Sequence, residues 1–128
     1  MEKRAYSTKD IEDLAIKYVV AYLTGRGEEA KVIKKGIDVI SGKKLIEVKG
    51  CMKTDTNLRV TQQTIDYLEK NNGFDNFLIY YVYKMETEPK LQIFDNKTFQ
   101  KHNIKETRYI LQPNTIKEKT EPIPLKKF

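Results

Sequence analysis

The sequence predicts a single α/β domain, and three features carry that prediction. Residues 8–23 place apolar side chains at helical spacing, as an amphipathic helix does. Residues 37–48 contain two Ile- and Val-rich runs around a Ser-Gly-Lys-Lys turn, which indicates a hairpin. Residues 77–83 are almost continuously apolar or aromatic, which is typical of a strand buried on both faces of a mixed sheet. Helices and strands in this order predict a central sheet flanked by helices.

The first helix has its own start and stop signals. Ser7, followed three residues later by Asp10, resembles a capping box, and Thr8 is a competing N-cap. Gly25 and Gly27 are suited to end the helix. We therefore expect it to run from about residue 8 to residue 23.

Shorter patterns predict the remaining elements. Residues 51–59 are polar and predict a loop, and a helix is expected over 61–70 because Asn-Asn-Gly follows it. The other expected elements are a first strand within 28–34, a strand over 90–94, a short helix or turn over 96–102, and an edge strand over 108–112.

Length and composition limit the organisation and the compartment. A chain of 128 residues can bury one core but not two, so we assign residues 1–112 to one domain. Residues 113–128 contain prolines and alternating charges, which favour an extended C-terminal tail. The single Cys51 fits a reducing cytoplasm, and no apolar run approaches membrane-spanning length. We therefore expect a cytoplasmic protein without membrane contact.

Two carboxylates stand out in the predicted hairpin. A turn at Gly42 sets a register in which Asp38 faces Glu47, and Lys49 shares their face of the strand pair. The opposite face is apolar and should belong to the core; its residues are Ile37, Val39, Ile46 and Val48. Opposed residues have Cβ atoms about 4.5–5.5 Å apart, and like charges at that spacing destabilise a sheet. A divalent cation with a preference for hard oxygen ligands would remove the repulsion. The alternative is a solvated strand end at which the lysine neutralises the acids.

The same residues resemble a known family. Residues 36–38 (Gly-Ile-Asp), a short hairpin and residues 46–50 (Ile-Glu-Val-Lys-Gly) resemble the core motif of the PD-(D/E)XK nuclease superfamily, which includes restriction endonucleases and Holliday-junction resolvases. The proline of the family name is absent here. The resemblance covers residues from about 8 to 83 and implies a restriction endonuclease-like αβββαβ core with a mixed central sheet flanked by helices.

The resemblance also implies roles for individual residues. Asp38, Glu47 and the carbonyl of Val48 would bind Mg²⁺, with Mn²⁺ as a substitute, and Lys49 would act on the reacting phosphate or water. The first helix of the family usually adds an acid to the metal site, and Glu12 is the matching position. On helical-face grounds alone, Glu12 is equally an ordinary surface residue. The loop acids Glu28 and Glu29 are alternatives, although loop acids are usually solvated.

A second element of the family follows the Glu-x-Lys strand. Gln63 and Tyr67 lie four residues apart on one helix face and resemble the Gln-x-x-x-Tyr element of RecB-like members, in which the glutamine positions nucleic acid or water. Gln62 is the rival position. A core tyrosine beside an exposed glutamine is the commoner explanation of such a pair.

These expectations combine into a metal-dependent endonuclease that hydrolyses phosphodiester bonds, restriction-like or junction-resolvase-like. A net charge of +6 suits a polyanionic partner, and we expect DNA rather than RNA. Small members of the superfamily often pair to cut two strands, so we expect a homodimer. The alternatives are a catalytically silent nucleic-acid-binding or assembly module on the same fold, and a structural protein whose hairpin only looks nuclease-like.

Overall fold

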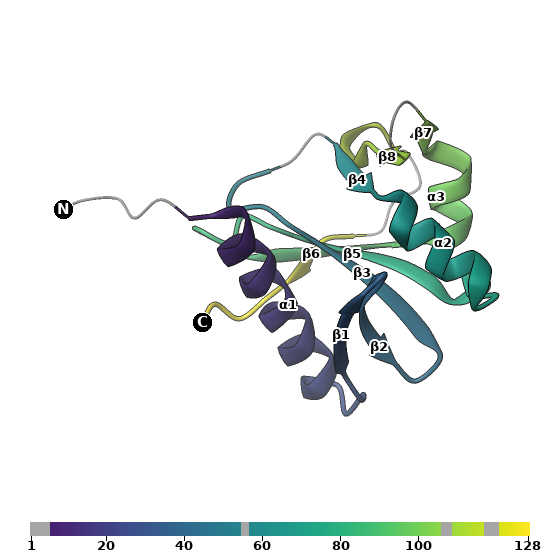
Figure 1. Ribbon diagram of the computed structural model, residues 1–128. Helices are drawn as coiled ribbons and strands as arrows, with labels where there is room; N and C mark the ends of the chain where they lie inside the picture. The colour runs from purple at the N-terminus through teal and green to yellow at the C-terminus, as the bar shows by residue number, and fades with distance from the viewer. Residues whose placement is uncertain (1–5, 55–56, 106–108, 117–120) are drawn as a thin grey trace.

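A mixed six-stranded sheet forms the centre of the molecule. The computed structural model describes residues 6–54, 57–105, 109–116 and 121–128. Helix α1 (Thr8–Gly25) covers one face of the sheet, and α2 (Gln62–Lys70) and α3 (Asn96–His102) lie on the other (Figure 1). This is the α/β class that the sequence predicts. Within the described residues, every helix is too short or too polar to span a lipid bilayer.

The start of α1 matches its sequence signal. The Ser7 hydroxyl accepts a hydrogen bond from the Asp10 main-chain N–H at 3.1 Å, and the Asp10 carboxylate accepts one from the Ser7 N–H at 3.3 Å. Together they satisfy two N–H groups that a helix start leaves without partners. The capping box is therefore confirmed, with Ser7 as the N-cap. The helix continues to Gly25, slightly beyond the predicted end.

Three antiparallel strands follow α1. They are β1 (Lys31–Lys35), β2 (Ile37–Ser41) and β3 (Lys44–Gly50). Ser41 pairs with Lys44, Ile40 with Leu45 and Val39 with Ile46, as predicted. Gly42 has a φ of 60°, a value that suits the first central position of a type II′ turn.

The central pair of the sheet is parallel. Strand β5 (Phe77–Tyr83) runs beside β3 in the same direction, and the chain between them contains β4 (Leu58–Val60), α2 and the short 3₁₀ helix η1 (Phe74–Asn76). Alternate side chains of β5 enter the α1-side core and the α2-side core, so the strand is buried on both faces as predicted. Strands β6 (Lys90–Asp95) and β9 (Ile123–Pro124) complete the sheet order β1-β2-β3-β5-β6-β9.

A second, three-stranded sheet lies beside the first and corrects two expectations. Strand β8 (Tyr109–Leu111) is flanked by β4 and β7 (Ile104–Lys105), so it is the middle strand of this sheet rather than an edge strand. Residue 108, the predicted start, lies outside the described residues. Strand β4 begins within residues 51–59, which were predicted as a loop, because three residues are too few to show an alternating pattern.

The expected face of Ile37 is also corrected. The predicted alternation groups Ile37 with Val39, Ile46 and Val48, but Ile37 packs in the α2-side core and the other three pack under α1. The pairing of β1 with β2 is irregular between Val32 and Lys35, and this irregularity ends just before Ile37. A bulge of this kind bends the strand and turns side chains away from strict alternation.

The C-terminal residues run along the sheet. Ile123 and Pro124 pair with β6 after the 3₁₀ helix η2 (Pro113–Thr115), and the Phe128 ring lies 4.6 Å from that of Tyr18 on α1. Residues 117–120 lie outside the described residues. The division into a domain over 1–112 and a tail over 113–128 stays a prediction.

Gly50 allows α1 to lie close to the end of β3. A Cβ atom at this position would lie 2.5 Å from the Ala15 Cβ and 3.2 Å from the Ile11 main-chain oxygen. We expect Gly50→Ala to lower the free energy of unfolding by about 1–3 kcal/mol, the usual range for an overpacked core. Urea unfolding measures the change. Gly25→Ala is the matched control, since a Cβ there meets nothing within 4 Å; equal stability of the two variants would contradict this packing.

Candidate active site

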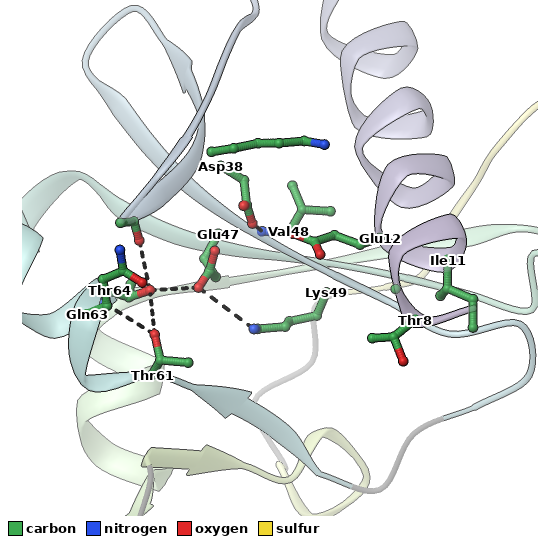
Figure 2. A pocket seen from close by; sticks show the side chains of 13 residues that line it. Thr8, Ile11, Glu12, Asp38, Glu47, Val48, Lys49, Thr61, Gln63 and Thr64 are labelled. Atoms are coloured by element: carbon green, nitrogen blue, oxygen red, sulfur yellow. Dashed lines mark hydrogen bonds and ion pairs between the residues drawn. The ribbon is translucent and has the colours of Figure 1, made fainter. Parts of the chain in front are cut away.

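A pocket of about 460 Å³ opens beside the start of α1, the strands β2 and β3, and the start of α2 (Figure 2). All six residues that the sequence singles out contribute to its walls. The lining residues are Thr8, Ile11, Glu12, Lys34, Gly36, Asp38, Glu47, Val48, Lys49, Gly50, Thr61, Gln63 and Thr64.

Asp38 is held by the neighbouring strand. Only 9% of its surface is exposed, and its Oδ2 accepts a hydrogen bond from the Val48 main-chain N–H at 2.8 Å. The paired register of the hairpin runs from Ser41 to Val39 and ends one step before Asp38. The predicted direct pairing of Asp38 with Glu47 is thus replaced by a side-chain bond from Asp38 to the backbone of β3.

Glu47 is buried between three polar neighbours. It is 6% exposed, and its Oε2 lies 2.8 Å from the Thr64 hydroxyl and 3.7 Å from the Lys49 ammonium. Figure 2 shows the other carboxylate oxygen turned toward Asp38. The two acids therefore meet at the floor of the pocket, with Lys49 beside them.

Burial changes the protonation of Glu47. Loss of hydration, together with the neighbouring Asp38 carboxylate, raises the pKa of Glu47 from 4.5 to about 8, although Lys49 and Thr64 oppose the rise. The Thr64 hydroxyl has one proton and also lies 2.8 Å from the Gly36 main-chain oxygen, which can only accept. When the Thr64 hydroxyl donates to the Gly36 main-chain oxygen, a protonated Glu47 can donate to the Thr64 hydroxyl oxygen. All three groups then have a hydrogen-bond partner. At neutral pH this acid pair retains a proton unless a cation replaces it.

Glu12 lines the pocket from α1 but is exposed. Among the described residues, no group of three or more His, Cys, Asp or Glu side chains is arranged to hold a metal ion. The alternative acid Glu28 instead binds Arg26 at 3.0 Å and Lys44 at 2.7 Å, and Glu29 is exposed on the loop. Among the acids of α1 and of the loop that follows it, Glu12 is thus the one that lines the pocket.

The two glutamines of α2 have different surroundings. Gln63 lines the pocket, whereas the Gln62 side chain donates a hydrogen bond to Asp66 at 2.9 Å on the exposed side of the helix. Tyr67 packs against Gly36, whose φ is 80° and whose position has no room for a Cβ atom. The Gln63 position is therefore the one that reaches the site, and Tyr67 fixes the helix against the strands.

Comparison with known proteins places the chain in a family. The family model described as Protein NO VEIN, C-terminal, matches residues 11–94, which is more than half of the chain. The chain belongs to this NO VEIN C-terminal family. All six sequence-predicted site residues lie inside the matched segment. A comparison with curated proteins gave no match.

In this member of the NO VEIN C-terminal family, one buried site residue is not predicted by the sequence patterns described above. Thr64 is 2% exposed and contacts Glu47 directly. A signal for it exists, because Thr64 shares the buried face of α2 with Ile65 and Leu68. A hydroxyl on an otherwise apolar helix face predicts a buried partner.

The donor set of this NO VEIN C-terminal domain fits a hard divalent cation. Asp38 and Glu47 are side by side and buried, and burial raises the pKa of Glu47 to about 8, so a cation would take the place of its proton at neutral pH. Mg²⁺ usually binds through one or two carboxylates and keeps several waters, so two acids in the pocket are enough. Glu12 would need to approach from the pocket wall to become a third ligand.

Proposed function

We propose that the protein is a metal-dependent nuclease that hydrolyses phosphodiester bonds, most simply a DNA endonuclease. The observation that carries the proposal is the pair of buried carboxylates, Asp38 and Glu47, with Lys49 within 3.7 Å of Glu47 at the floor of one pocket. A pair of buried acids is unfavourable for stability, so its presence in a pocket points to a binding or catalytic role.

The resemblance to the PD-(D/E)XK superfamily supports the same proposal. The observed order of α1, β1, β2, β3, α2 and β5 agrees with the αβββαβ core of that superfamily, apart from the inserted strand β4. The chain also has an acid, Asp38, near the start of the first hairpin strand, followed by Glu-x-Lys on the second. A shared fold alone does not fix a function, and the acids and the lysine in the pocket are what make the comparison useful.

Each of the six predicted site residues has a distinct part in this proposal. Asp38, Glu47 and the Val48 carbonyl would hold the cation, and Glu12 would complete the set. When bound, a divalent cation supplies Lewis-acid chemistry to a phosphodiester. The Lys49 ammonium would stabilise the negative charge that develops on the phosphoryl oxygens. The Gln63 amide, at the pocket wall, would orient the scissile phosphate or the attacking water.

The proposed substrate is DNA, with RNA as the second choice. The net charge of +6 favours a polyanion, and neutralisation of Asp38 and Glu47 by a cation would make the pocket more favourable still for a phosphate. A homodimer would allow two strands to be cut, and we propose it as the form that acts on duplex or branched DNA.

The test combines a cleavage assay with a metal-binding measurement. Wild-type protein and Asp38→Asn, which keeps an oxygen for the Val48 N–H, are incubated with Mn²⁺ and supercoiled, linear, single-stranded and four-way-junction DNA, and with RNA. We expect wild type to cut at least one substrate and Asp38→Asn to cut none. Binding of DNA without cutting would replace the proposal by the silent binding module, and absence of both Mn²⁺ and nucleic-acid binding would replace it by a structural protein.

A further inference from the structure

Thr64 is a buried hydroxyl on the apolar face of a helix. It lies in the first turn of α2 and shares the buried side of that helix with Ile65 and Leu68. Moving a hydroxyl out of water is unfavourable unless protein groups replace its hydration. Valine has nearly the same shape and would fill this position without that cost. The hydroxyl therefore has a role besides packing.

The hydroxyl joins the backbone of one segment to a side chain of another. Thr64 Oγ1 lies 2.8 Å from the Gly36 main-chain oxygen and 2.8 Å from Glu47 Oε2. Gly36 is itself fixed, because a Cβ atom there would lie 2.7 Å from the Tyr67 Cβ. Helix α2 is thus packed against Gly36, the residue that joins β1 to β2. From this helix the Thr64 hydroxyl forms a hydrogen bond with Glu47.

This contact selects one orientation of the Glu47 carboxylate. The last torsion of a glutamate side chain is broad, so the group rotates easily unless it is held. Thr64 holds Oε2 on the side of Lys49, and Figure 2 shows the other oxygen turned toward Asp38. Asp38 in turn has its Oδ2 held by Val48. Each acid therefore has one oxygen held by a hydrogen bond, Asp38 by the Val48 N–H and Glu47 by the Thr64 hydroxyl.

We propose that Thr64 is the positioning residue that orients Glu47 for divalent-cation binding. The inference rests on the proposed function, because it takes Asp38 and Glu47 as the cation-binding pair. Thr64 lines the pocket but is only 2% exposed, and its hydroxyl is bonded to Glu47, so we assign it an action through Glu47 rather than on the substrate. Removing a partner of this kind typically lowers metal affinity by about 10–100-fold.

The test separates the hydroxyl of Thr64 from its shape. Thr64→Val keeps the shape and removes the hydroxyl, whereas Thr64→Ser keeps the hydroxyl and removes a methyl group. Calorimetric titration with Mn²⁺ gives the affinity of each variant, and urea unfolding with a chelator gives its stability. We expect Thr64→Val to bind Mn²⁺ about tenfold or more weakly and Thr64→Ser to bind it as wild type does. Thr64→Ala replaces the valine variant if the latter does not fold.

The outcomes distinguish the inference from the proposed function. If Mn²⁺ affinity falls in both variants in step with stability, Thr64 has only a structural role and the inference is wrong. If Thr64→Val binds Mn²⁺ as tightly as wild type, the inference is also wrong. In both of these cases the proposed function is unaffected. If wild type itself binds no Mn²⁺, the metal-dependent nuclease is wrong, and the inference with it.

Discussion

Replacing Lys49 by alanine should lower the rate of DNA cleavage by about 10²–10³-fold, the usual cost of removing one preorganised group that stabilises transition-state charge. Its ammonium lies beside the acid pair, 3.7 Å from Glu47 Oε2, and lines the pocket. Single-turnover cleavage with saturating Mn²⁺ measures the effect on the chemical step rather than on product release.

Mn²⁺ affinity gives this prediction a second readout. Lys49 competes with a cation for Glu47, so Lys49→Ala should bind Mn²⁺ at least as tightly as wild type while cutting slowly. Lys43→Ala is the matched control, since Lys43 is an exposed lysine in the β2–β3 turn and its loss changes the net charge equally. Equal cleavage rates for the two variants would remove Lys49 from the proposed mechanism.

Without divalent cations, the protein should become less stable as the pH rises from about 4.5 to about 8. Across this range the folded protein keeps a proton on Glu47, whose pKa is raised from 4.5 to about 8 by burial and by Asp38, whereas the unfolded chain has lost it. Because the folded state binds more protons, the free energy of unfolding falls with pH, by about 2–5 kcal/mol over the whole window.

Urea unfolding at pH 5 and pH 8.5 in the presence of a chelator measures this slope. Glu47→Gln, which cannot ionise, should remove most of it, whereas Glu29→Gln, at an exposed loop position, should leave it unchanged. Mn²⁺ should restore stability at the higher pH, because a cation that binds only the folded state stabilises it. A wild-type slope equal to that of Glu47→Gln would show that Glu47 ionises normally.

Local patterns in the sequence predicted the elements that depend on local contacts. Ser7 and Asp10 lie one helical turn apart, so the capping box that they form could be read directly. The turn at Gly42 predicted the hairpin register correctly from Ser41 as far as Val39. The site residues on β2 and β3 were predicted from this hairpin and line the pocket, whereas Glu12 and Gln63, which also line it, were predicted from the family resemblance.

Non-local contacts account for what the sequence did not predict. The role of Thr64 depends on α2 packing against Gly36, and a single hydroxyl in a helix does not identify its partner. Strands β4 and β7 are two or three residues long and exist because β8 lies between them. The face taken by Ile37 depends on a bulge in β1, which alternation alone cannot reveal.

From the parallel pairing of β3 with β5 we expect the site to assemble in a particular order during folding. Asp38 and Val48 are ten residues apart across one tight turn, so their contact requires only a short loop to close. Thr64 reaches Glu47 through the crossover that joins two parallel strands, and closing that longer loop costs more chain entropy and is slower. A chain caught before the crossover docks would therefore have its two acids together but lack the hydroxyl proposed to orient one of them. Pulse-labelled hydrogen exchange should then show β2 and β3 protected before α2.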